Sequence, residues 1–164
     1  MTYCYIFCTC GENVGKIQAK EKAKYWIIKY LAFFLVPRPD TFVQCRDISR
    51  ECGFETMNAI LDGDRIPDAV FCFNDQLAIG ALKAIKKRGY RIPEQIAVMG
   101  FSESQSALLT EPQLSSVAQP LDLIGETAAN LLLEKIKNPD APDRTVVLDA
   151  RINIRESTDV RPQQ

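Results

Sequence analysis

Short apolar runs alternate with longer segments of helical periodicity along most of this chain. The clearest pair is the run 69–73 and the segment 74–89. The run contains only apolar and β-forming residues, which is typical of a strand buried on both faces of a parallel sheet. The segment after it has an apolar stripe at helical spacing, made by Ala78, Ala81, Leu82 and Ile85. The sequence therefore predicts a strand that leads directly into an amphipathic helix.

Both ends of this predicted helix carry the expected signals. Asn74 or Asp75 can cap its start, because a short side-chain oxygen can accept the unpaired N–H groups of the first turn. The basic run 86–88 lies at the other end, where the helix dipole favours cations. Gly89 is placed to end the helix in the left-handed conformation.

Similar pairs of apolar run and amphipathic segment occur on both sides of this unit, with short connections. They predict an α/β fold of three layers, a parallel sheet with helices on both faces. Segment 101–113 is a polar loop, broken by Pro112. The helix that opens at Gln119-Pro120 has an apolar face suited to a core, made by Ile124, Ala128, Leu131, Leu132 and Ile136. The other predicted elements are strands at 3–10, 41–45, 96–100, 114–118 and 145–148, and helices at 16–35 and after Ser49.

Composition narrows the class of protein. A chain of 164 residues with 46% hydrophobic and 25% charged residues is ordinary for one soluble globular domain. The net charge of −1 argues against direct binding of nucleic acid, and no block of basic residues longer than the helix end 86–88 stands out. The most apolar segment, 25–36, contains Lys29 and is too short to span a bilayer. The first predicted strand leaves no room for a signal peptide, so we expect a cytoplasmic location.

The residue types also limit the chemistry. The chain has no histidine, which removes the usual nucleophile–base pairs and the commonest metal ligand. It has neither a phosphate-binding glycine loop nor a nucleophile elbow, so we expect no enzyme and no cofactor. The six cysteines form no C-x-x-C motif and favour buried, reduced thiols over a metal site or disulfides.

One polar residue lies where α/β sheets bind their ligands. Asn74 follows the strand at 69–73 directly, and ligands of such sheets lie beyond the carboxyl ends of the strands. The same position suits a helix cap, so Asn74 is either a cap alone or also a ligand contact.

Several segments match the ordered motifs of a known family. They are 66–81 (IPDAVFCFNDQLAIGA), 89–93 (GYRIP), 96–101 (IAVMGF), 112–120 (PQLSSVAQP), 124–125 (IG) and 155–158 (REST). Through these segments the chain resembles, from about residue 43 to 158, the effector-binding core of LacI-family transcription regulators, which has the type I periplasmic binding protein fold. The resemblance implies a regulator whose core binds a small molecule, usually a sugar or a purine compound, between two subdomains.

The resemblance implies four ligand contacts on this subdomain. Asn74 matches the family's Asn or Asp, which binds ligand hydroxyls. Ser102 stands where the family usually has Asp, Ile48 where an aromatic ring often stacks, and Lys22 where an Arg usually holds the ligand. Serine loses a carboxylate acceptor, and lysine loses the bidentate geometry of arginine.

It also implies a domain organisation and partners. Residues 1–118 would form the main α/β subdomain, 119–144 a crossover helix that belongs to the other subdomain, and 145–164 a return strand and tail. The family's DNA-binding headpiece is absent from this sequence, so DNA would be bound only through a separate part. The helix around Ile79 and the loop near Thr110 would form a homodimer interface.

Three functions remain open at this point. The first is the effector-binding and dimerisation domain of a LacI-family regulator. The second is a solute-binding protein for transport, which shares the fold. The third is a shortened dimerisation module that binds no small molecule.

Overall fold

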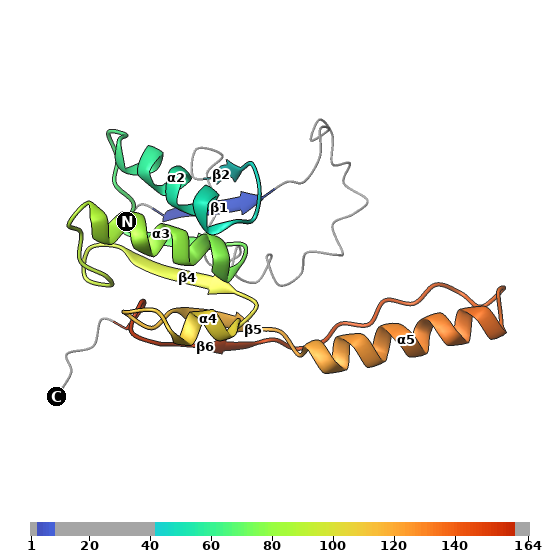
Figure 1. Ribbon diagram of the computed structural model, residues 1–164. Coiled ribbons are helices and arrows are strands. Elements are labelled where there is room, and N and C mark those ends of the chain that lie inside the picture. Colours follow the sequence, from blue (N-terminus) through green and yellow to red (C-terminus); the bar gives the residue numbers. More distant parts are fainter. Residues whose placement is uncertain (1–2, 9–41, 160–164) are drawn as a thin grey trace.

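The computed structural model of the chain describes residues 3–8 and 42–159 (Figure 1). The helix predicted at 16–35 and Lys22 lie outside these residues. Most predicted elements are confirmed, with bounds that differ by a few residues at most. The strands are β1 (Tyr3–Cys8), β2 (Phe42–Cys45), β3 (Ala69–Cys72), β4 (Ala97–Phe101), β5 (Ser115–Ala118) and β6 (Arg151–Asn153). The helices are α2 (Arg50–Leu61), α3 (Asp75–Lys87), α4 (Gln105–Leu108) and α5 (Leu121–Lys137).

The strands form one six-stranded sheet in the order β2-β1-β3-β4-β5-β6. The first five strands are parallel, which confirms the predicted α/β class. Among the described strands, only β6 is antiparallel, and it pairs with β5 at the edge of the sheet. The strand predicted at 145–148 is wrong, since this segment has no regular structure. Its apolar residues Val146 and Val147 run beside α5 and have no strand to pair with among the described residues.

The core lies between one face of the sheet and helices α2 and α3. Val70 and Cys72 of β3 and Val98 of β4 point into it and are buried. All four residues of the stripe predicted on α3 are buried as well, which confirms the period of that segment. The helices contribute Met57, Leu77 and Ile85, each without exposed surface.

Two glycines allow α2 and α3 to cross at close range. A Cβ atom added to Gly80 would lie 2.1 Å from the carbonyl oxygen of Arg50. One added to Gly53 would lie 2.3 Å from the carbonyl oxygen of Leu77. Both obstacles are backbone atoms of the facing helix, so a side chain at either position would force the helices apart.

The helix ends follow the predicted capping pattern. The Ser49 hydroxyl accepts a hydrogen bond from the Cys52 N–H at 3.1 Å, and Asn74 Oδ1 accepts one from the Leu77 N–H at 2.8 Å. Gly89 has a φ of +81°, the left-handed conformation expected after α3.

Helix α5 and the segment 138–150 project from the sheet on the side where the parallel strands end (Figure 1). The two are joined by an ion pair of Glu134 with Arg144 and by a hydrogen bond from Lys135 Nζ to the Ala141 carbonyl oxygen at 2.6 Å. No α5 residue is buried and Leu132 is 61% exposed, so the apolar face predicted on this helix has no partner in the described chain. The helix is amphipathic, but no described helix or strand covers its apolar stripe.

Candidate functional site

The candidate residues gather at the carboxyl edge of the sheet. Ile48, Asn74 and Ser102 follow β2, β3 and β4, and these strands are parallel within one sheet. The carboxyl ends of these strands therefore lie at the same edge of the sheet, where the strand arrows end in Figure 1. Asn74 Nδ2 donates a hydrogen bond to the carbonyl oxygen of Ile48 at 3.4 Å, which ties two of the three loops together.

Asn74 does cap α3, as one of the two predictions for it required. Its Oδ1 atom accepts from the first turn of the helix while its amide nitrogen reaches the neighbouring loop. A side-chain amide has two donor hydrogens and two acceptor lone pairs, so this pairing leaves capacity for a ligand. The role of Asn74 as a ligand contact stays a prediction.

Ile48 lies in a short loop that its neighbours hold in shape. Asp47 Oδ1 accepts a hydrogen bond from the Ser49 N–H at 2.9 Å, and Ser49 in turn caps α2. The Ile48 side chain is 50% exposed. The loop thus presents an apolar surface at the same edge as the polar groups.

Asp75 is a structural centre of this edge that the sequence did not single out. Its side chain is 1% exposed, and its Oδ1 atom accepts a hydrogen bond from the Ser116 hydroxyl at 2.7 Å. Its other oxygen accepts one from the Ser104 N–H at 2.5 Å. Gly100 makes room for it, because a Cβ there would lie 2.3 Å from Oδ1. The available signal was an acid directly after the capping Asn74, combined with a glycine inside the next strand.

The loop after β4 has an unusual backbone. Ser102 and Glu103 have φ angles of 109° and 55°, which residues other than glycine rarely adopt. Two hydrogen bonds hold the turn: the Ser102 N–H donates to the Val117 carbonyl oxygen at 2.9 Å, and the Glu103 N–H donates to the Ser116 hydroxyl at 3.1 Å. Strained backbone of this kind is concentrated at functional sites.

Glu103 and Arg155 form an ion pair beside this turn, with side chains 23% and 15% exposed. Arg155 Nη1 also donates to the Leu114 carbonyl oxygen at 2.7 Å, which fixes the guanidinium against β5. Burial works to raise the pKa of Glu103, but hydrogen bonds from Arg155 and Asn153 and the charge of Arg155 outweigh it and leave the pKa lowered.

Replacing Glu103 with glutamine should therefore destabilise the fold in a pH-dependent way. We expect a loss of about 1 kcal/mol in the free energy of unfolding at pH 7, because a charge-assisted hydrogen bond is lost. A lowered folded-state pKa stabilises the fold above the usual pKa of glutamate, and this contribution disappears as the pH falls through the folded-state value. Urea unfolding at neutral and acid pH measures the difference, and a difference that grows in acid would contradict the assignment.

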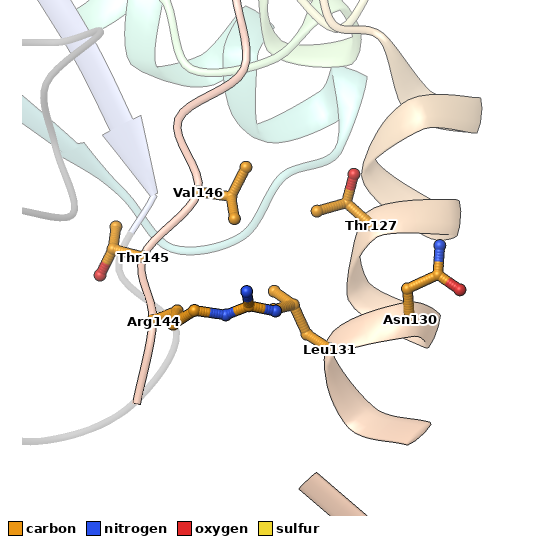
Figure 2. Close-up of a pocket in the computed structure, with 6 residues that line it drawn as sticks. All are labelled: Thr127, Asn130, Leu131, Arg144, Thr145 and Val146. Atoms are coloured by element: carbon orange, nitrogen blue, oxygen red, sulfur yellow. The ribbon is translucent and has the colours of Figure 1, made fainter. Parts of the chain in front are cut away.

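The structure also has a hollow of about 420 Å³ away from these residues. It lies between α5 and the segment that returns beside it, and Figure 2 shows Leu131 and Arg144 pointing toward one another across it. The lining residues are Thr127, Asn130, Leu131, Arg144, Thr145 and Val146. None of the predicted ligand contacts lines it, so the hollow and the sheet edge are separate candidates. In the part of the chain that the structure describes, no group of three acidic, histidine or cysteine residues could hold a metal ion.

Ile79 and Thr110, the two residues predicted at a dimer interface, lie away from the sheet edge. Ile79 is half-buried on α3 and packs against the core. Thr110 follows α4, a short helix within the segment predicted as loop, and its hydroxyl donates to the Ala107 carbonyl oxygen at 3.0 Å. Leu108 and Leu109 beside it are 47% and 86% exposed. The role of Ile79 and Thr110 in a dimer stays a prediction.

Comparison with known proteins agrees with this architecture. Residues 31–158 match the model of the periplasmic binding protein-like domain. A transcriptional repressor, PurR of Salmonella arizonae, is 35% identical over 147 residues, which are 90% of this chain and 40% of the repressor. The chain thus spans about two fifths of the length of the curated relatives that it matches.

Solved structures agree as well. A LacI-family transcriptional regulator from Sanguibacter keddieii matches with a TM-score of 0.73 and 27% identity, over 95% of this chain and 57% of that one. A LacI-family regulator from Arthrobacter in complex with lactose matches with a TM-score of 0.73 and 26% identity, over 96% of this chain and 58% of that one.

Among the helices that the structure describes, none is long and apolar enough to cross a membrane. The family model and the solved structures agree on one assignment. The chain therefore belongs to the periplasmic binding protein-like family and corresponds to the effector-binding domain of LacI-family transcription regulators.

Proposed function

We propose that this chain senses a sugar or a nucleoside as part of a LacI-family transcription regulator. The effector lies on the carboxyl edge of the sheet, against Asn74, Ile48 and Ser102, with Lys22 as a fourth contact. The curated relatives are transcriptional repressors and not enzymes, which favours sensing over catalysis. DNA binding belongs to a headpiece outside this sequence.

The observation that carries the proposal is the convergence of three loops of different chemistry at one edge. An amide, a hydroxyl and an exposed apolar side chain follow three strands of one sheet. Sugar hydroxyls need both donors and acceptors, and the apolar C–H face of the ring needs an apolar surface. Ligand sites usually combine a few convergent polar groups with apolar walls in this way.

The edge forms one half of the effector pocket in this proposal. The other half comes from a second subdomain, and residues 119–144 connect the two. The uncovered apolar stripe of α5 supports this, since Leu132 and Ile136 are 61% and 65% exposed. A homodimer through the surface around Ile79 and Thr110 completes the proposal, supported by the exposed Leu108 and Leu109 next to Thr110.

A thermal-shift assay on the chain tests the proposal with ribose, lactose, cellobiose, adenosine and guanosine at millimolar concentrations. We expect at least one compound to raise the melting temperature. The key variant is Asn74→Ser, because serine caps helices as well as asparagine but is too short to reach a ligand. It should keep the melting temperature of the free protein and lose the shift.

Asn74→Ala serves as the matched comparison, since it loses both the cap and the contact. It should lower stability by about 1 kcal/mol in addition to removing the shift. A full effector shift in Asn74→Ser would show that Asn74 is only a cap. Failure of every compound to shift the wild type would favour a dimerisation module without a ligand.

A further inference from the structure

Two thiols meet where β2 passes into α2. Cys45 is the last residue of β2, and Cys52 lies in the first turn of α2. Both side chains are buried, 1% and 4% exposed. Only six residues separate them in the sequence, and the loop with Ile48 lies between them.

A single hydroxyl group lies between the two sulfur atoms. The Oγ1 atom of Thr56 is 3.1 Å from the Cys45 sulfur and 3.9 Å from the Cys52 sulfur. Thr56 lies one helical turn after Cys52, on the same side of α2, which explains how it reaches both. The two thiols are therefore held side by side.

The surroundings favour the thiolate form of Cys52. Burial raises the pKa of this thiol, but hydrogen bonds outweigh burial and lower it overall. They come from the Asp47 backbone N–H, the Cys45 thiol, the Thr56 hydroxyl and the Arg46 backbone N–H. The position in the first turn of a helix acts in the same direction, because the helix dipole stabilises an anion there.

We propose that Cys45 and Cys52 form a redox-active dithiol that hydrogen peroxide converts to a disulfide. The thiolate of Cys52 attacks one peroxide oxygen, the O–O bond breaks, and the released hydroxide takes up the proton that Cys52 lost. The resulting sulfenic acid is then attacked by the sulfur of Cys45, which forms the S–S bond and expels water. Two thiols and one peroxide become one disulfide and two waters.

Oxidation changes the loop between the two cysteines. Oxidation removes the thiolate charge that the N–H groups of Arg46 and Asp47 favour, and it joins the two ends of the loop covalently. Ile48 lies in this loop, so oxidation would alter the loop that contributes Ile48 to the proposed effector site. This last consequence rests on the proposed function, whereas the dithiol itself does not.

Tryptic peptide mapping tests the proposal without reference to any effector. The intact chain is treated with hydrogen peroxide, free thiols are blocked, and the protein is digested without reduction. Cleavage at Lys and Arg places Cys45 in peptide 30–46, Cys52 in 51–65, Cys72 in 66–83, and Cys4, Cys8 and Cys10 in 1–16. We expect peptide 30–46 linked to peptide 51–65, with a loss of two hydrogens.

Variants identify the order of events. Cys52→Ser should abolish the link, and Cys45→Ser should leave a sulfenic acid on Cys52 that dimedone captures. Cys72→Ala should leave the link unchanged. Thr56→Val should slow peroxide oxidation about fivefold because it loses the shared hydroxyl, while Thr56→Ser should keep the rate.

Two outcomes would overturn the proposal. Cys8 is the register partner of Cys45 across β1 and β2, so a link between peptides 1–16 and 30–46 would assign Cys45 to another pair. Recovery of both thiols unoxidised, under conditions that oxidise free glutathione, would show that the pair is only core packing.

Discussion

Replacing Gly80 with valine is expected to remove about 3 kcal/mol or more from the free energy of unfolding. Even the first side-chain atom would lie 2.1 Å from the carbonyl oxygen of Arg50 and 2.7 Å from the backbone nitrogen of Phe54. Both atoms belong to the backbone of α2, which cannot yield as a flexible side chain would. Overpacking of a close-packed interior usually costs 1–3 kcal/mol, and a collision with rigid backbone lies at the upper end or beyond.

Gly125→Ala is the matched control, because Gly125 lies inside α5 and an added Cβ meets nothing within 4 Å. We expect this variant to be as stable as the wild type or more stable by up to about 1 kcal/mol, since alanine favours the helix. Urea unfolding followed by circular dichroism measures both. Equal midpoints for Gly80→Val and the wild type would show that α2 and α3 do not cross as closely as described.

Asp75→Ala is the second substitution with a large expected effect, a loss of about 2–3 kcal/mol. It leaves the Ser116 hydroxyl and the Ser104 N–H without their acceptor inside the protein, and unpaired buried donors are costly. The loop with Ser102 and Glu103 should also loosen, because Asp75 accepts a hydrogen bond from the N–H of Ser104, the next residue of that loop. Chemical unfolding gives the free energy, and amide hydrogen exchange at residues 102–104 reports the loop.

The control for this substitution is Asp122→Ala. Asp122 is also an aspartate in the first turn of a helix, but it is exposed. Its removal should cost no more than about 0.5 kcal/mol. If the two variants lose the same stability, Asp75 acts only through the helix dipole and does not organise the site.

The unit from β3 to α3 could be predicted from the sequence because its signals are local. Asn74 and Gly89 mark the two ends of α3 by capping chemistry, and the apolar stripe on this helix has one clear period. The position of Asn74 beyond a strand end followed from the same argument. The carboxyl edge was thus predictable as a place, although the roles of its residues were not.

The features that were missed depend on contacts between distant parts of the chain. Asp75 binds groups 29 and 41 residues away, and nothing local distinguishes it from an ordinary helix-start acid. Val146 and Ile152 lie in similarly apolar segments, yet only the second segment has β5 beside it to pair with. The spacing of apolar residues along α5 correctly predicts an apolar face. The spacing does not tell which element covers that face.

The most direct test of the account is NMR mapping of amide shifts during titration with the compound that gives the largest thermal shift. A half-pocket binds weakly, and NMR detects millimolar binding residue by residue. The account predicts shifts in the loops 46–49, 73–75 and 102–104. Shifts confined to residues 127–131 and 144–146, around the hollow beside α5, would contradict it.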